Sequence, residues 1–341
     1  MVDIEKLVRP NILALKPYSS ARDEYAGGAG IFLDANENPF GELNRYPDPH
    51  QRDLKHKLAT LKAVNDNNIF VGNGSDEVID LAFRIFCIPG VDKALTFAPT
   101  YGMYEVSSAI NNIELLTIPL TTDFQIDVEK VKLYFADSSI KLLFICSPNN
   151  PTGNLMNKRD VEYILKNFNG IVIIDEAYID FAKEASLISL IDQYNNLIVS
   201  QTFSKAWGLA AARVGLAYAN SEVISLFNKV KSPYNVSKIN QQAAIDALTK
   251  FEVYSERLTL ILKEKERLIA QLQELVIVKK IYPSDANFLL LEVEHADSLY
   301  TALVAQHIIT RNRSKQVENC IRISIGTPHE NDELVKALKD I

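Results

Sequence analysis

The sequence predicts an α/β protein with a large domain, whose mainly parallel sheet is covered by helices on both faces, and a smaller α+β domain. Three observations lead to this prediction. The chain has 341 residues, which is long for one hydrophobic core and suits one large and one smaller domain. Between about residues 52 and 235, short β-branched or apolar runs alternate with helical patterns, as in parallel sheets. After about residue 236 this alternation ends.

The large domain is expected to span residues 46–235. Seven apolar runs in it have the length and composition of strands, and helical patterns lie between several of them. The expected strands are 69–72, 94–97, 115–118, 142–146, 171–175, 197–201 and 214–219, and the expected helices are 76–87, 101–111 and 158–168.

The small domain is expected to combine residues 236–341 with residues 1–45, which form an N-terminal arm. The first 45 residues are irregular and rich in Pro, Gly and Asn. A stretch from 238 to 275 repeats apolar residues at helical spacing and predicts one long helix. It is followed by the run FLLLEV, a helix near 297–307, the run CIRISIG and a final helix.

The composition is that of an ordinary soluble globular protein, with 47% hydrophobic and 23% charged residues. A net charge of −7 argues against general binding to nucleic acid or anionic membranes. The scattered cysteines Cys87, Cys146 and Cys320 indicate buried thiols in a reducing compartment. No signal peptide and no membrane span of about 18 apolar residues is evident. We therefore expect a cytoplasmic protein, without a metal site, that contacts neither nucleic acid nor membrane.

Lys205 stands in an otherwise apolar setting. The run LIVSQTFSKAWGLAAARVG leads from a strand through Thr202 and Ser204 to this lysine, and then through a glycine turn to Arg213. Lysine is seldom buried without a partner or a role. Desolvation and cationic neighbours lower the pKa of a lysine towards nucleophilic values, which a Schiff-base lysine needs. Read alone, however, the run fits a structural lysine at a strand end better.

Polar residues also follow two earlier strands. Asp175 ends the apolar run of IVIIDEAYIDF, where a carboxylate can pair with a protonated ring nitrogen of a cofactor, and Tyr178 can hydrogen-bond a ring oxygen. An Asp that caps a helix is the alternative. Glu176 is expected to point to the opposite face. Asn150 lies in SPNNPTG at the carboxyl end of a strand, where ligands of parallel sheets gather.

The run VGNGSDEVIDLAF has the features of a phosphate cradle. Gly72 and Gly74 permit a tight turn, Ser75 can cap, and a helix from Asp76 offers free N–H groups to an anion. Read alone, the run fits a capped helix without a ligand better. Tyr101 in APTYGMY can stack on a flat cofactor or belong to the ordinary core. Further phosphate contacts are expected from Thr202 and Arg213.

The order of the motifs is more specific than any one of them. GNGSDE, PTYGMY, SPNNPTG, IDEAY and SKAWGLAAARVG each end or follow an expected strand. In this order they resemble the fold-type-I aminotransferases that use pyridoxal 5′-phosphate (PLP), over nearly the whole chain. The resemblance implies that Lys205 forms the Schiff base, Asp175 pairs with the pyridine nitrogen, and Tyr178 and Asn150 contact the 3′-oxygen. The resemblance also implies a set of residues around the phosphate and the ring of the cofactor. These are Gly74, Ser75, Asp76, Thr202, Ser204, Arg213 and Tyr101.

Both ends of the chain narrow the resemblance. LKPYSSAR, LDANENPFG, RYPDPHQRDL, ITRNRSKQ and CIRISIGTPHEND are similar to the histidinol-phosphate aminotransferase family. This similarity implies histidinol phosphate and glutamate or 2-oxoglutarate as substrates. It also implies a homodimer in which Tyr46 reaches the cofactor phosphate of the neighbouring subunit. Arg322 would bind the anionic group of the substrate, with Arg311 and Tyr18 near its phosphate, whereas the imidazole would meet Asn36 or Glu37.

Several alternatives stay open at this point. Arg322 also fits a surface-facing strand residue, and Arg313 fits a solvated face better than a site. Where the family commonly reads AFGLAGLR, this chain has Trp207, Ala211 and Ala212, which requires a negative φ at the alanines. An aromatic amino-acid aminotransferase or a decarboxylase of amino-acid phosphates shares much of the pattern. A PLP-binding regulator would need a DNA-binding domain, for which this chain leaves no room.

Overall fold

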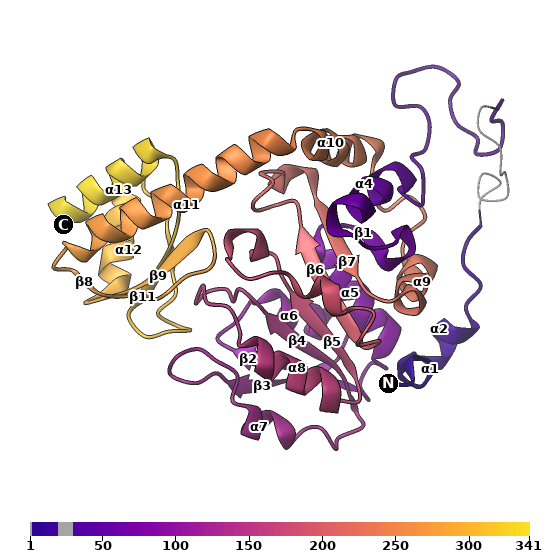
Figure 1. Ribbon diagram of the computed structural model, residues 1–341, viewed down its shortest axis with the longest axis horizontal. Coiled ribbons are helices and arrows are strands. Elements are labelled where there is room, and N and C mark those ends of the chain that lie inside the picture. Colours follow the sequence, from indigo (N-terminus) through magenta and orange to yellow (C-terminus); the bar gives the residue numbers. More distant parts are fainter. Residues whose placement is uncertain (1, 20–29) are drawn as a thin grey trace.

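The large domain is built on one seven-stranded sheet. A computed structural model describes residues 2–19 and 30–341 (Figure 1). The strands lie in the order β1–β7–β6–β5–β4–β2–β3, and all are parallel except β7, which is antiparallel to both its neighbours. The predicted fold class, with its mainly parallel sheet, is therefore confirmed. The strands are β1 (Ile69–Asn73), β2 (Lys93–Ala98), β3 (Glu114–Pro119), β4 (Ile140–Cys146), β5 (Ile171–Asp175), β6 (Leu197–Thr202) and β7 (Val214–Tyr218).

Successive residues of a strand point to opposite faces of the sheet. Both sets are apolar here, so helices cover both faces. On β5, for example, Val172 and Ile174 belong to one core and Ile171 and Ile173 to the other. The first core is closed by α4 (Arg52–Lys62), α7 (Val128–Lys132), α8 (Lys158–Asn167) and α10 (Lys238–Thr249). The second is closed by α5 (Ser75–Phe86), α6 (Met103–Ile110) and α9 (Ser221–Val230). Short 3₁₀ turns, η1 (Asp66–Asn68), η2 (Ile179–Phe181), η3 (Leu187–Leu190) and η4 (Ala210–Ala212), complete the large domain.

The N-terminal helices pack on the large domain. In α1 (Ile4–Leu7) and α2 (Pro10–Ala14), buried side chains such as Ile4 and Ile12 join the core that contains Phe83 and Phe227. This differs from the expected grouping of residues 1–45 with the small domain, because apolar residues in an irregular segment do not reveal which core they enter. Residues 20–29 of the expected arm lie outside the described residues.

The expected long helix over 238–275 is divided in two. Lys250, with φ −99° and ψ 43°, leaves the helical conformation between α10 and α11 (Phe251–Gln273). Ala244 of α10 is buried in the large-domain core, whereas Leu268 of α11 is buried in the small-domain core. Figure 1 shows α11 running from α10 to the small domain. The two halves have different packing partners, so an uninterrupted helical periodicity did not indicate the break.

The small domain has a four-stranded antiparallel sheet in the order β10–β11–β9–β8, as an α+β domain requires. Its strands are β8 (Val278–Ile281), β9 (Phe288–Val293), β10 (Arg311–Asn312) and β11 (Cys320–Ser324). With α11, α12 (Ala296–Ala305) and α13 (Pro328–Asp340) they enclose an apolar core. The short strands β8 and β10 were not expected from the sequence, because neither carries a sustained apolar run.

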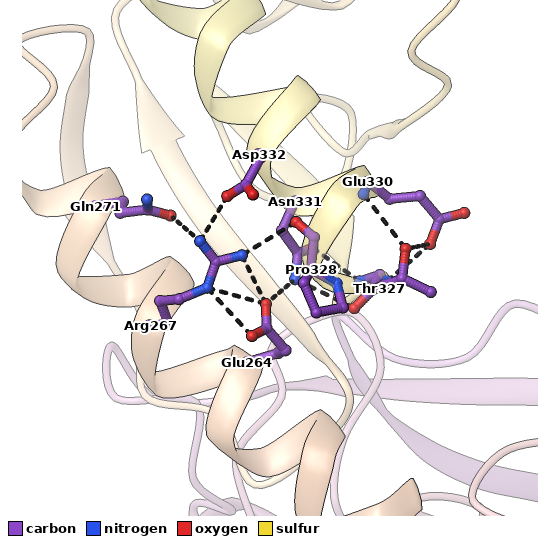
Figure 2. Close-up of polar contacts among 9 residues, drawn as sticks. Glu264, Arg267, Gln271, Thr327, Pro328, Glu330, Asn331 and Asp332 are labelled. Atoms are coloured by element: carbon purple, nitrogen blue, oxygen red, sulfur yellow. Dashed lines mark hydrogen bonds and ion pairs between the residues drawn. The ribbon is translucent and has the colours of Figure 1, made fainter.

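Polar contacts fix the corner where α11 meets α13 (Figure 2). The Arg267 guanidinium donates hydrogen bonds to Glu264 at 2.7 Å and to Asp332 at 2.5 Å. Glu264 also accepts a hydrogen bond from the amide of Asn331 at 3.0 Å. Thr327 and Glu330 form a capping box at the start of α13. The charges in this corner therefore have partners within the chain.

The two domains meet beside Lys205. Tyr178 of the large domain and Phe288 of β9 share a small apolar cluster, and Trp207 stacks on Tyr254 of α11 at 3.8 Å between ring centroids. The domain limits at residues 45 and 235 stay a prediction. Among the described residues, no helix combines the length and apolar character needed to cross a membrane.

Candidate active site

A cavity of about 120 Å³ lies at the carboxyl ends of β4, β5 and β6, beside the start of α5. Parallel strands end together at this edge, and the side chains that follow them therefore converge. Its polar lining contains every residue expected to bind cofactor except Gly74 and Tyr46. The lining consists of Ser75, Asp76, Tyr101, Asn150, Asp175, Tyr178, Thr202, Ser204, Lys205 and Arg213, together with Cys146, Ala177 and Ala210.

Asp175 ends β5 as a buried carboxylate that is 3% exposed. It accepts hydrogen bonds from the Tyr104 hydroxyl at 2.8 Å and from the Ala177 N–H at 3.2 Å. No cation among residues 2–19 and 30–341 forms an ion pair with it, and burial raises its pKa to about 6. A protonated ring nitrogen would supply the missing positive charge. Tyr104 was missed in the sequence because it lies inside an apolar helix without a polar motif.

Glu176 points away from this cavity, as expected. Its carboxylate accepts hydrogen bonds from the Ser186 hydroxyl at 2.5 Å, the Leu187 N–H at 2.8 Å and the Gln201 amide at 2.9 Å. Two neighbouring carboxylates thus face opposite sides of the chain, and Glu176 is held by structural contacts.

Lys205 follows β6, and its amine lies 5.6 Å from the centroid of the Tyr178 ring. Partial burial lowers the pKa of Lys205, and the positive charges of Arg322 and Arg213 lower it further. A lower pKa increases the fraction of neutral amine, which is the form that attacks a carbonyl carbon. The lysine keeps access to solvent on one side, so a carbonyl compound can reach it.

An anion cradle lies next to this lysine, at the N-terminus of α5. Gly74 has φ +78°, and a Cβ there would lie 2.4 Å from an Arg213 guanidinium nitrogen, so the position requires glycine. Arg213 lies 3.4 Å from the Ser204 hydroxyl, which in turn lies 3.0 Å from that of Thr202. The first N–H groups of α5, at Ser75 and onward, have no acceptor within the helix. Hydroxyls, amides and a guanidinium together suit a phosphate group.

Asp76 and Tyr101 are linked at the same edge. The Tyr101 hydroxyl donates to one Asp76 oxygen at 3.2 Å, and the other Asp76 oxygen lies 3.4 Å from Arg213. Burial, followed by the nearby Asp76 charge, raises the pKa of Tyr101, so the phenol stays protonated. The Tyr101 ring is held in the cavity wall, where a planar group can lie against it.

The small domain reaches this cavity through Arg322 of β11. Its guanidinium donates to the side-chain oxygen of Asn150 at 2.5 Å and lies 5.2 Å from the Phe288 ring centroid. The Asn150 amide donates to the Tyr178 hydroxyl at 3.4 Å. Arg322 is half-buried at the domain junction, so it does not face open solvent. Arg311, opposite Arg322 in the strand pairing, is exposed.

Arg313 was expected on a solvated face, but part of its side chain is buried. The structure buries its Nε, and burial lowers the pKa of Arg313 to about 10, as do Arg322 and Arg311. The polar character of the segment ITRNRSKQ concealed this placement. A pattern of two arginines separated by one residue, opposite a third on the next strand, is a signal that would have revealed it.

Other expected substrate and cofactor contacts lie apart from the cavity. Tyr46 is 50% exposed and stacks on Tyr234 at 4.3 Å between centroids. It lines a second cavity, of about 410 Å³, together with Asn36 and Glu37. Tyr18 is 70% exposed. Within one chain, these residues are therefore not brought to Lys205.

This chain belongs to the aminotransferase class I and II family, whose model matches residues 30–338. It is 50% identical to the histidinol-phosphate aminotransferase of Cytophaga hutchinsonii, over 98% of each chain. A solved histidinol-phosphate aminotransferase from Clostridium acetobutylicum superposes with a TM-score of 0.81 at 27% identity, covering 87% of this chain and 90% of that one. That from Sinorhizobium meliloti, solved in complex with pyridoxal-5′-phosphate, gives 0.79 at 26% identity, covering 90% and 89%.

PLP is the cofactor of this family, and the cavity has a group for each of its functional parts. The amine of Lys205 suits the aldehyde, and the unpaired buried carboxylate of Asp175 suits the ring nitrogen. Asn150 and Tyr178 lie together where a ring oxygen can accept hydrogen bonds, and the Arg213 cradle suits the phosphate. The residues present therefore fit PLP.

Proposed function

We propose that this enzyme transfers an amino group between glutamate and imidazole-acetol phosphate, giving 2-oxoglutarate and histidinol phosphate in histidine biosynthesis. The observation that carries the proposal is the position of Arg322, which connects the Lys205 cavity to an arginine-lined edge of the small domain. The chain is 50% identical to two relatives named histidinol-phosphate aminotransferase, and this similarity supports the choice of substrate.

Lys205 is the residue that moves protons. PLP, when bound, supplies an electron sink for the bond that breaks at the amine-bearing carbon. The Lys205 amine would take the proton from that substrate carbon and deliver it to the carbon on the other side of the transferred nitrogen. Asp175 holds a proton on the ring nitrogen, and Asn150 and Tyr178 orient the ring through its oxygen. The Arg213 cradle holds the cofactor phosphate.

Arg322 binds the two anions that use the pocket in turn. One is the α-carboxylate of glutamate and the other is the phosphate of histidinol phosphate. A guanidinium suits both, because each anion accepts paired N–H hydrogen bonds. Similarity to the histidinol-phosphate aminotransferase family assigns Arg311 and Tyr18 to the phosphate and Asn36 or Glu37 to the imidazole, although Tyr18, Asn36 and Glu37 lie outside the Lys205 cavity of their own chain.

A homodimer completes the site in this proposal. Tyr46 lies outside the cavity of its own chain and is half-exposed, so it is available to the cofactor phosphate of a neighbouring subunit. Mixing the inactive variants Lys205→Ala and Tyr46→Ala tests this, because a mixed dimer has one site with both residues intact. Activity regained on mixing supports the shared site, and a mixture as inactive as its parts contradicts it.

The substrate proposal is tested by an amino-transfer assay with the purified PLP-loaded enzyme. We expect turnover of histidinol phosphate with 2-oxoglutarate to exceed that of phenylalanine by at least about 100-fold, because the single carboxylate of phenylalanine accepts fewer charge-assisted hydrogen bonds than a phosphate does. Preference for phenylalanine would identify an aromatic amino-acid aminotransferase instead. Release of CO₂ from an amino-acid phosphate without amino transfer would identify a decarboxylase.

A further inference from the structure

Arg313 presents a buried donor without an acceptor. Its Nε is enclosed and has no hydrogen-bond partner among the described residues, whereas one terminal nitrogen donates to Gln316 at 3.1 Å. A buried donor on a charged group costs folding free energy unless something accepts its hydrogen. The described residues therefore satisfy only part of this partly buried guanidinium.

The strand pairing places Arg313 on the same side as two other arginines. Arg311 lies directly opposite Arg322 in the β10–β11 register, so both side chains leave the same face. The Arg313 N–H donates to the Cys320 carbonyl at 2.9 Å, which continues this ladder by one residue. Residues two apart on a strand share a face, so Arg313 follows Arg311.

This face is turned to the Lys205 cavity. Arg322 reaches Asn150 there. After the dominant effect of burial, the pKa of Tyr178 responds to the charges of both Arg322 and Arg313, and that of Arg313 responds to Arg322 and Arg311. The strand register places Arg313 on the face of Arg322, and its charge acts on Tyr178, which lines the cavity.

The three arginines have no acidic partner. None of them forms an ion pair in the described part of the chain, although the protein carries 43 acidic residues and a net charge of −7. Arg322 is met by an amide and an aromatic ring, and Arg313 by a glutamine. Arg322 and Arg313 are partly buried on the same face as the exposed Arg311, so their combined charge favours an anion with more than one charge.

We infer that Arg313 is a specificity-determining residue that binds the phosphate of the substrate and makes the pocket prefer a phosphate monoester over a carboxylate. A phosphate monoester carries a charge of about −1.5 to −2 and three terminal oxygens. A carboxylate has one charge and two oxygens, which one guanidinium satisfies in paired fashion. Arg322 therefore suffices for glutamate, and Arg313 adds binding for the phosphate substrate. The inference rests on the proposed function.

The variant Arg313→Gln tests this in the PLP-loaded enzyme. We expect kcat/KM for histidinol phosphate to fall about 10- to 100-fold, the range of one charge-assisted hydrogen bond. For glutamate it should change less than about 3-fold, because the carboxylate is held by Arg322. Equal losses for both substrates, or no loss for either, would overturn the inference.

Two further variants and one probe make the outcome unambiguous. Lys336→Gln removes one exposed positive charge from α13 and should leave both values unchanged. Arg313→Lys keeps the charge without the fork of donors, and should recover part of the preference. Inorganic phosphate should inhibit the reaction of glutamate, with an inhibition constant at least about 10-fold higher in Arg313→Gln.

Inorganic phosphate also separates this inference from the proposed function. If the native enzyme does not turn over histidinol phosphate but Arg313→Gln weakens inhibition by phosphate, the substrate proposal fails and the anion site stands. If phosphate inhibits both proteins equally, the role of Arg313 is refuted whatever the substrate.

Discussion

The corner between α11 and α13 differs from the cavity between the domains in whether its charged residues have ion-pair partners. In the corner, Arg267 has Glu264 and Asp332 within hydrogen-bond distance, and those hydrogen bonds hold the pKa of Glu264 below its usual value. In the cavity, Arg213 pairs with Asp76 at 3.4 Å, but Asp175, Lys205 and Arg322 have no ion-pair partner within the described residues. The paired charges of the corner stabilise the fold, whereas Asp175, Lys205 and Arg322 are available to bind a ligand.

The same contrast appears between two adjacent residues. Glu176 is satisfied by three hydrogen bonds from its own chain, but Asp175 is left with a hydroxyl and one N–H. Burial raises the pKa of both carboxyls. The difference lies in what surrounds them, so neutralising Asp175 should affect function and neutralising Glu176 should affect the fold.

Replacing Lys205 by Ala should have the largest effect. Loss of the group that transfers protons lowers turnover by at least about 1,000-fold, within the range of general acid–base catalysis. Lys166→Ala, which changes an exposed lysine of α8, is the matched control and should keep full turnover. Partial recovery of Lys205→Ala by an added small amine would locate the defect in the missing amine, whereas near-native turnover without any addition would contradict the assignment.

Replacing Asp175 by Asn should lower turnover but stabilise the cofactor-free protein. Turnover falls by at least about 100-fold, because the neutral amide no longer favours a protonated ring nitrogen. In the folded protein the pKa of Asp175 is about 6, above the usual 3.8 of an aspartate side chain, so ionisation of Asp175 opposes folding. The resulting loss of unfolding free energy grows as the pH rises from 3.8 to about 6, and it reaches its full value above pH 6.

Urea unfolding of the cofactor-free proteins measures this cost. Above pH 6 the variant should exceed the native protein by on the order of 1–3 kcal/mol, and the difference should shrink towards pH 4. A difference that is the same at both ends of this range would show that Asp175 is not buried as a free carboxylate. Glu176→Gln is the control. The Glu176 carboxylate is already hydrogen-bonded, so replacing it by an amide should not raise the unfolding free energy.

Replacing Tyr104 by Phe should have a smaller effect on the same carboxylate. The ring keeps its packing on Phe144, at 4.9 Å between centroids, but the 2.8 Å hydrogen bond to Asp175 is lost. That hydrogen bond lowers the pKa of Asp175, so its removal raises this pKa further. We expect a loss of turnover of about 10-fold, the effect of one hydrogen bond to a charged group. An unchanged pH profile of kcat would contradict this role.

The cavity in the large domain could be predicted from the sequence because its signals are local. Lys205, Asp175 and Asn150 each follow an apolar strand, and parallel strands bring their ends to one edge without further information. The assignment of Thr202, Ser204 and Arg213 to the same edge follows from their distance along the chain to Lys205.

Features that depend on contacts between distant segments could not be predicted. The break at Lys250 arises because α10 and α11 pack on different domains. Tyr104 meets Asp175 across the sheet edge, and nothing in the apolar run around it shows a polar partner. Arg313 stands in a polar segment, and its burial follows from the strand pairing of β10, which is too short to recognise.

The most direct test of the contrast between partnered and unpartnered charges compares Arg322→Gln with Arg267→Gln. Arg322→Gln should lower kcat/KM for glutamate by about 100-fold and cost less unfolding free energy than Arg267→Gln, because no acidic residue among the described residues pairs with Arg322. Arg267→Gln should lower the unfolding free energy by about 1–2 kcal/mol and leave kcat/KM unchanged, because its partners are in the chain. If both variants lose stability and neither loses activity, the cavity charges are structural and the account is wrong.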